Sequence, residues 1–151
     1  MHEKEIELFT KSLQYCQDEF YLDAIESLLD LASTYPKSEL ADDALYNVGL
    51  CFFNLNQFEK AIEYFQRVIN EFPEATISVL EGGDEYGQTA AKCYYATLNC
   101  CLAMGRIEEA ADIIEKLVAF PDSYVVRADG TKLTYKEFAE LALNTYNSNQ
   151  K

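Results

Sequence analysis

The feature that most constrains the fold of this chain is an internal repeat with a period of 37 residues. Six positions recur at this shift with the same kinds of side chain, in the order apolar, small, aromatic, alanine, apolar and proline. The first copy is Leu8, Ser12, Tyr15, Ala24, Leu28 and Pro36, and the second is Leu45, Gly49, Phe52, Ala61, Phe65 and Pro73. A less regular third copy follows after a longer spacing of 48 residues from proline to proline, at Tyr94, Leu98, Cys101, Ala110, Ile114 and Pro121. Because a unit of this length cannot bury its apolar face alone, consecutive units must stack.

The spacing within each unit predicts a pair of helices. Apolar residues recur at i, i+3, i+4 and i+7, which gives each helix one buried stripe, and the alanine lets the second helix approach the first closely. Proline cannot continue a helical hydrogen-bond ladder, so each second helix ends before it. Ser38 is expected to cap the helix that follows it. We expect first helices at about 4–17, 39–54 and 86–104, and second helices at about 22–34, 58–71 and 107–119.

The middle unit resembles the tetratricopeptide repeat, in which a large residue, a small residue and an aromatic mark the first helix, and Ala, an apolar residue and Pro mark the second. The residues that carry the resemblance are Leu45, Val48, Gly49, Phe52, Ala61, Phe65 and Pro73. The resemblance covers about residues 5–122, and the lengthened period is similar to that of bacterial cell-envelope proteins of the Tol/Pal and outer-membrane-assembly type. It implies an all-α fold, a right-handed superhelix of three helical hairpins with a C-terminal capping helix.

The expected organisation is a single domain at about residues 1–147. Its parts are three repeats at about 5–38, 39–75 and 88–122, an acidic insertion at about 74–87, a C-terminal turn and capping helix at about 123–147, and a tail at 148–151. The insertion contains no Lys or Arg and is expected to be a loop. Asp129-Gly130 predicts a turn or small hairpin. Thr134 and Glu137 then form a capping box for the last helix, which would cover the end of the stack.

The charge balance restricts the partner. Twelve Lys and Arg stand against 26 Asp and Glu, which gives a formal charge of −14. This charge repels phosphate backbones and anionic lipid headgroups, so we expect neither nucleic-acid binding nor binding to a membrane surface. The longest uncharged stretch, from Cys93 to Gly105, is too short to cross a bilayer. A charged partner would therefore be basic.

The N-terminus and the cysteines favour the cytoplasm. The chain is charged from Glu3 onward and shows no apolar stretch of a secretory signal. Three of the five cysteines, Cys93, Cys100 and Cys101, fall on one predicted helix, where they cannot form ordinary disulfides with one another. We expect small buried thiols there, with redox sensitivity of the adjacent Cys100 and Cys101 as a hypothesis.

Catalytic chemistry has few residues to use. The only histidine is His2, so we expect neither a catalytic triad nor a histidine-centred metal site. The sequence Gly82-Gly83-Asp84-Glu85-Tyr86 resembles the signature of diguanylate cyclases, which belong to an α/β fold, whereas repeat helices flank it here. We therefore expect no enzymatic activity, no metal and no cofactor.

The candidate binding residues are those that the resemblance places on the concave face of the stack, which the first helices line. Three rows of equivalent positions are Phe9, Tyr46 and Tyr95; Leu13, Leu50 and Asn99; and Cys16, Phe53 and Leu102. Aromatic residues beside apolar ones suit the binding of a peptide. The same periodicity also fits packing against the next repeat or the C-terminal helix.

Asn47 and Lys92 complete the candidate groove. They match two of the positions at which some tetratricopeptide modules clamp a C-terminal carboxylate, whereas Phe9, Leu13 and Ala96 occupy the other positions and do not fit. We therefore expect a non-catalytic adaptor or chaperone-like scaffold that binds an apolar or basic segment of another protein. One alternative is a self-assembling subunit, a homodimer through the groove or the C-terminal helix. A third hypothesis is a nucleotide enzyme that uses the loop at 82–86.

Overall fold

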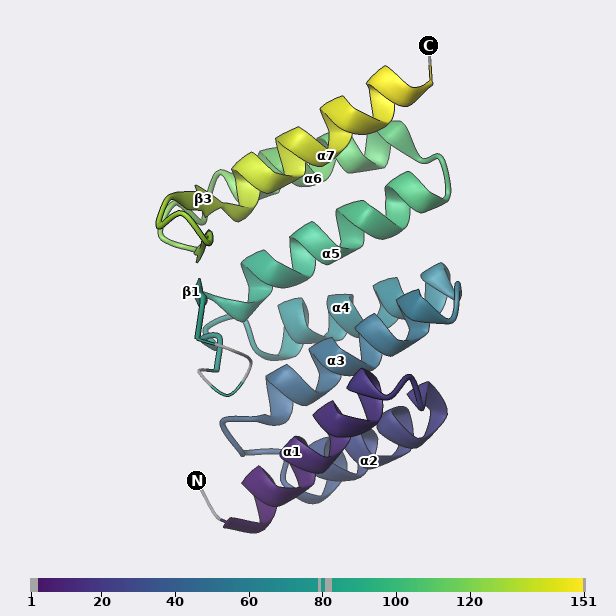
Figure 1. Ribbon diagram of the computed structural model, residues 1–151, viewed down its shortest axis with the longest axis vertical. Helices are drawn as coiled ribbons and strands as arrows, with labels where there is room; N and C mark the ends of the chain where they lie inside the picture. Colours follow the sequence, from purple (N-terminus) through teal and green to yellow (C-terminus); the bar gives the residue numbers. More distant parts are fainter. Residues whose placement is uncertain (1–2, 79, 81–82, 151) are drawn as a thin grey trace.

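A computed structural model of the protein describes residues 3–78, 80 and 83–150. These residues form seven α-helices and three short β-strands. The helices are α1 (Glu3–Gln17), α2 (Tyr21–Thr34), α3 (Ala41–Asn54), α4 (Phe58–Glu71), α5 (Thr89–Ala103), α6 (Ile107–Leu117) and α7 (Tyr135–Asn149). The strands are β1 (Glu85–Tyr86), β2 (Tyr124–Val126) and β3 (Lys132–Thr134). Figure 1 shows the helices stacked along the long axis, with the two termini at opposite ends.

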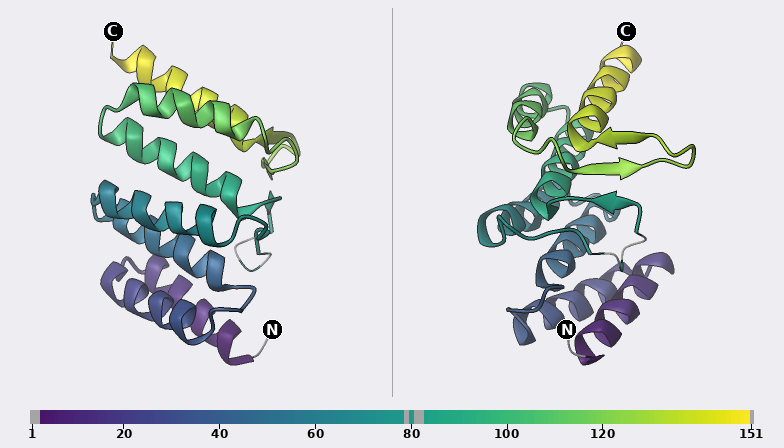
Figure 2. Two further views of the ribbon diagram at one scale, coloured as in Figure 1. Left: turned by 180° about the vertical axis from the view of Figure 1, so that it is seen from behind. Right: turned by 90° about the vertical axis from the view of Figure 1, so that its left-hand side faces the viewer.

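The first six helices form three stacked hairpins, as the repeat predicts. α1 packs on α2, α3 on α4 and α5 on α6, and each hairpin also packs on the next; the view from behind in Figure 2 shows the same order. The helices begin and end within three residues of the predicted bounds, and the largest difference is α5, which begins at Thr89 rather than at 86. The stacking of helix pairs is confirmed, and the sense of the superhelix stays a prediction.

The same turn joins the two helices of every hairpin. Glu19, Asn56 and Gly105 occupy the equivalent position of the three turns, and their φ angles are 65°, 60° and 74°. A residue in the left-handed region after a helix end lets the chain leave the helix and reverse direction. The repeat in the sequence is therefore also a repeat in backbone conformation.

Small residues let the two helices of a hairpin approach closely. Ala24, Ala61 and Ala110, the alanines of the three units, are fully buried. Gly49 of α3 lies so close to Phe65 of α4 that a Cβ atom at this position would overlap the ring. The surrounding apolar residues form three core clusters, and each extends from one hairpin onto the next helix of the stack: the first onto α3, the second onto α5 and the third onto α7.

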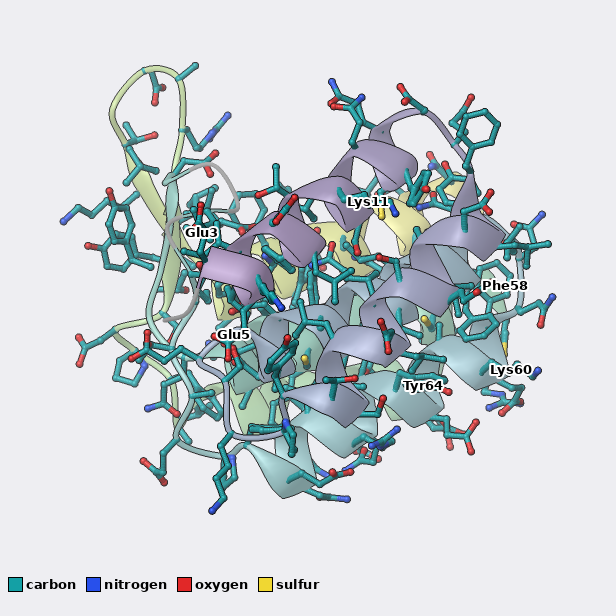
Figure 3. All side chains as sticks on the ribbon, turned by 90° about the horizontal axis from the view of Figure 1, so that it is seen from below. Glu3, Glu5, Lys11, Phe58, Lys60 and Tyr64 are labelled. Atoms are coloured by element: carbon teal, nitrogen blue, oxygen red, sulfur yellow. The ribbon has the colours of Figure 1, made fainter. Side chains whose placement is uncertain are left out.

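Phe52, the aromatic residue of the repeat motif in the middle hairpin, contacts side chains of α4. The rings of Phe52 and Tyr64 stack with their centroids 5.6 Å apart. The Nζ atom of Lys60 lies 5.4 Å from the centroid of the Phe52 ring. Figure 3, which views the stack from below, shows Lys60 and Tyr64 close together on α4, away from the sheet. Phe52 is thus used for packing, both within its own hairpin and against the first core cluster.

Ser38 does not cap α3, so this prediction is wrong. α3 begins at Ala41, which places the N-cap at Leu40, and no side chain caps the helix. The Oγ atom of Ser38 instead accepts a hydrogen bond of 3.1 Å from the N–H of Leu40. The same hydroxyl donates a hydrogen bond of 3.2 Å to Oε2 of Glu5. Ser38 therefore ties the connection between two hairpins to the first helix.

The C-terminal segment contains the small hairpin that the sequence predicts. β2 and β3 pair in antiparallel fashion. In the turn between them, Oδ1 of Asp129 accepts hydrogen bonds from the hydroxyl and the N–H of Thr131, at 2.6 and 3.0 Å. These bonds hold the pKa of Asp129 below its ordinary value. Gly130 has a φ of 85°, a conformation that residues with a side chain rarely adopt.

The fold is mostly α-helical, but the insertion at about 74–87, which was expected to be a loop, contributes a strand to a small sheet. β1 joins the hairpin to make an antiparallel sheet in the order β1–β2–β3, visible beside the helices in the right-hand view of Figure 2. A Cβ atom at Gly87 would overlap Ser123, so glycine is needed where the insertion meets the C-terminal segment. Residues 79 and 81–82 of the insertion lie outside the described residues.

The last helix packs over the end of the stack, as predicted. The hydroxyl of Thr134 accepts a hydrogen bond of 3.1 Å from the N–H of Glu137, and Oε1 of Glu137 accepts one of 3.0 Å from the N–H of Thr134. This is the predicted capping box. Tyr135 and Ala139 are buried in the third core cluster. Because α7 continues to Asn149, the predicted tail loses its first two residues to the helix.

Candidate partner-binding site

A small cavity lies between the first helices of the second and third hairpins, and we call it the α3–α5 cavity. Its volume is about 190 Å³. Its lining residues are Tyr46, Leu50 and Phe53 of α3, Phe65 of α4, and Tyr95, Ala96 and Asn99 of α5. Except for Phe65 and Ala96, these residues belong to the groove that the sequence predicts. The predicted groove residues of the second and third units therefore line the same cavity.

Helix geometry explains how these side chains come together. The lining residues of α3 are spaced i, i+4 and i+7, and those of α5 include i and i+4, so each helix presents one stripe. Tyr46 is almost fully buried, with its ring centroid 5.6 Å from that of Phe65. Leu50 and Phe53 are only half-buried. The cavity thus has an aromatic floor and a partly exposed apolar rim.

Buried polar contacts fix α5 against α3 and β1. The Oγ1 atom of Thr89 donates a hydrogen bond of 2.7 Å to Oδ2 of Asp42. The Nζ atom of Lys92 lies 2.5 Å from Oε2 of Glu85 and 4.4 Å from the centroid of the Tyr46 ring. Only 6% of the Lys92 side chain is exposed, so its charge is compensated inside the protein.

Asn47 and Lys92, the two residues that match the carboxylate clamp, both make contacts inside the protein. Asn47 is buried, and its Nδ2 atom donates a hydrogen bond of 2.8 Å to the backbone oxygen of Asp43. Lys92 makes the contacts with Glu85 and Tyr46 described above. Both residues lie on the helices that form the α3–α5 cavity, but neither lines it.

The C-terminal helix packs against one side of the predicted aromatic row. The ring centroid of Tyr95 lies 6.1 Å from that of Tyr135 and 6.0 Å from that of Phe138, both on α7. Packing on α7 thus accounts for part of the Tyr95 surface, as the alternative interpretation of this row holds. No residue of α7 lines the α3–α5 cavity, so within the described residues the C-terminal helix does not fill it.

The remaining groove residues lie elsewhere. Phe9 is fully buried in the first core cluster, because the buried stripe of α1 runs through Glu5, Phe9 and Ser12. Its side chain offers no surface to a partner. Leu13 and Cys16 are half-buried against the same cluster, and Leu102 packs against the third. The outer units therefore do not extend the cavity that the middle unit shares with α5.

Two lining residues, Phe65 and Ala96, were missed by the sequence analysis. Phe65 is the apolar residue of the second-helix motif, and the sequence analysis assigned that position to the core because it expected only first helices to line the groove. Ala96 matches a clamp position of the repeat, and this was the signal that could have placed it in the groove. A small side chain beside Tyr95 leaves room that a larger residue would fill.

The residues of the cyclase-like sequence have structural partners. Glu85 and Tyr86 form β1; Glu85 pairs with Lys92, and the Tyr86 ring stacks on Tyr124 at 5.3 Å between centroids. Gly82, like His2, lies outside the described residues. In the part of the chain that the structure describes, no group of three or more His, Cys, Asp or Glu side chains is placed to hold a metal ion. None of the described helices combines the length and the apolar character that a membrane span requires.

The cysteines on α5 are small buried residues, as expected. Cys93, Cys100 and Cys101 are all buried in core clusters. Burial raises the pKa of Cys100 to about 12 and, together with the charge of Glu109, that of Cys101 to about 11. Their thiols are therefore protonated at neutral pH, which disfavours oxidation at this pair.

Comparison with known proteins supports the reading of the middle hairpin. A family model of the tetratricopeptide repeat matches residues 43–75, which include most of α3 and all of α4. A comparison with curated proteins gave no significant match. Tetratricopeptide repeats mediate protein–protein interactions, so this segment indicates a protein partner in general terms.

Proposed function

We propose that the protein is a non-catalytic scaffold that acts in the cytoplasm and binds an apolar or basic segment of another protein at the α3–α5 cavity. On this proposal the first and third hairpins are also tetratricopeptide units. The observation that carries it is the position of the cavity, because three of its lining residues come from the first helix of the unit that matches the repeat family. The cysteines, all present as thiols, support a reducing compartment.

The size of the cavity favours a side chain as its occupant. Pockets for small-molecule ligands have volumes of roughly 300–1,000 Å³, and the α3–α5 cavity holds about 190 Å³. A single large apolar side chain fits a hollow of this size better than a metabolite does. The partner then needs one apolar residue as an anchor and an extended or helical backbone that runs along the rim.

The lining chemistry supports the same occupant. Aromatic side chains supply a large contact area at low entropic cost, and they are frequent among the residues that dominate binding energy. Asn99 lines the cavity and is half-buried, so its amide can hydrogen-bond to the backbone of a bound segment. The apolar side chains of the cavity would therefore contact the apolar anchor of the partner, and the amide of Asn99 would contact the polar main chain beside that anchor.

The net charge of −14 supports a basic flank around that anchor. A field of this sign attracts positively charged partners and speeds their association. The contribution is screened by salt, with a Debye length of about 10 Å at 0.1 M ionic strength. Binding should therefore weaken as salt is added, while contacts inside the cavity are affected less.

A peptide selection with matched variants tests this proposal. Peptides selected from a random display library should share an apolar anchor flanked by Lys or Arg. The change Leu50→Gln puts a polar amide in the cavity and should weaken binding of these peptides about tenfold or more. The matched control is Leu22→Gln, because Leu22 lies on α2 and is 72% exposed. Equal affinity of the two variants, or selected peptides without an apolar anchor, would contradict the proposal.

The homodimer is the competing proposal, and sedimentation distinguishes the two. A scaffold for another protein should sediment as a monomer at low and high micromolar concentration. A self-assembling subunit should form a dimer that Leu50→Gln or a change in α7 disrupts. A dimer that Leu50→Gln abolishes would assign the cavity to a second copy of the chain instead of a partner.

A further inference from the structure

Cys16 of the first hairpin and Cys51 of the second hairpin lie next to each other. Cys16 lies in the last turn of α1 and Cys51 in α3, and their Sγ atoms are 3.5 Å apart. Both are thiols. Cys51 is 1% exposed, whereas Cys16 is half-buried and reachable from solvent. We propose that this pair is an oxidation site, at which a peroxide converts the two thiols into a disulfide that joins α1 to α3.

The geometry requires only a small movement. A disulfide has an S–S bond of about 2.05 Å, so the two sulfur atoms must approach by about 1.5 Å. Both side chains pack in or against the first core cluster, on neighbouring hairpins. The bond would close a loop that contains the whole of α2.

The environment of the pair assigns different roles to the two thiols. A hydrogen bond from the Cys51 thiol favours the Cys16 thiolate and lowers the pKa of Cys16. The same contact, together with burial, raises the pKa of Cys51. Because the thiolate is the nucleophile and Cys16 is the more exposed residue, Cys16 reacts with the oxidant first.

The reaction balances with hydrogen peroxide as the only oxidant. The Cys16 thiolate attacks one peroxide oxygen, the O–O bond breaks, and the leaving oxygen takes up a proton as water, which leaves Cys16 as a sulfenic acid. The Cys51 sulfur then attacks the Cys16 sulfur, and the sulfenic oxygen leaves with the Cys51 proton as a second water. Two electrons pass from the two sulfurs to the peroxide, and a dithiol reductant reverses the change.

Tryptic mapping tests the pair directly, because the lysine and arginine positions separate the cysteines. Cleavage after Lys11, Lys37 and Lys60 gives one peptide with Cys16 alone, 12–37, and one with Cys51 alone, 38–60. The peptide 93–106 holds Cys93, Cys100 and Cys101 together and serves as an internal control. The folded protein is treated with hydrogen peroxide, then denatured, alkylated and digested.

We expect peptides 12–37 and 38–60 to appear as one cross-linked species within single molecules, while 93–106 keeps all three thiols open to alkylation. Dithiothreitol should restore both peptides. In Cys16→Ser, Cys51 should stay alkylatable, and in Cys51→Ala, Cys16 should proceed to a sulfinic acid. If Cys51→Ala fails to fold, the comparison of Cys16→Ser with the wild type still tests the proposal.

Three results would overturn the proposal. They are two alkylatable thiols after peroxide treatment, a cross-link between molecules, and oxidation of Cys51 in Cys16→Ser at the wild-type rate.

Discussion

Thr89 of α5 and Asp42 of α3, which are 47 residues apart in the sequence, are joined by a buried hydrogen bond of 2.7 Å. This bond connects the first turns of the two helices that form the α3–α5 cavity. The Lys92–Glu85 ion pair ties the same end of α5 to β1. The width of the proposed binding site therefore depends on polar contacts that a partner does not touch.

The Thr89–Asp42 bond gives the first prediction. The change Thr89→Val keeps the shape of the side chain but removes the donor, and it should lower the free energy of unfolding by about 1–2 kcal/mol. Thr89→Ser keeps the hydroxyl and is the matched control. Urea unfolding of the three proteins measures the difference. A valine variant as stable as the wild type would show that this bond does not fix α5.

The contact between Gly49 and Phe65 gives the second prediction. In Gly49→Ala the added methyl group overlaps a fully buried ring, so stability should fall by about 1–3 kcal/mol. In a Phe65→Leu background the obstructing ring is absent, and the same change should cost less. A double-mutant cycle from denaturant unfolding measures this coupling. An equal cost of Gly49→Ala in both backgrounds would contradict the packing described here.

The capping box of α7 gives a prediction on pH. Hydrogen bonds from the backbone and the hydroxyl of Thr134 lower the pKa of Glu137 from its ordinary value of 4.5. The ionised carboxylate therefore stabilises the folded state above pH 4.5, and this contribution is lost as the pH falls through the lowered pKa. Glu137→Gln keeps an acceptor without a titrating charge. The melting temperature of the wild type should exceed that of the variant at neutral pH.

Melting curves of both proteins between neutral and strongly acidic pH measure the effect. The advantage of the wild type over Glu137→Gln should shrink progressively below pH 4.5. A difference that stays constant across this range would mean that the charge of Glu137 does not contribute. The matched control is Glu140→Gln, because Glu140 lies one turn further along α7, outside the capping box.

The helix hairpins could be predicted because their signal repeats. The period of 37 residues fixed the positions of the turns as well as those of the helices, and Glu19 and Asn56 share a left-handed conformation at equivalent places. Thr134 and Glu137 were recognised because a capping box depends only on residues three apart. Local and periodic features of this kind need no knowledge of distant partners.

The sheet and the cysteine pair could not be predicted in the same way. β1 has only two residues, Glu85 and Tyr86, which is too few to show an alternating pattern, and its partner strand begins 38 residues after Tyr86. Cys16 and Cys51 are 35 residues apart, so they do not occupy equivalent repeat positions. Phe9 and Tyr46 share a repeat position and are both buried in core clusters, but only Tyr46 lines the α3–α5 cavity, because the surroundings of a side chain depend on which helices lie beside it in the stack.

The most direct test of the central claim is to map the contact surface of a selected peptide on isotope-labelled protein by nuclear magnetic resonance. We predict that the perturbed signals cluster at Tyr46, Leu50 and Asn99, the two sides of the α3–α5 cavity. Perturbations confined to Phe20 and Leu22, which are exposed at the start of α2, with the cavity residues unchanged, would contradict the assignment of the binding site.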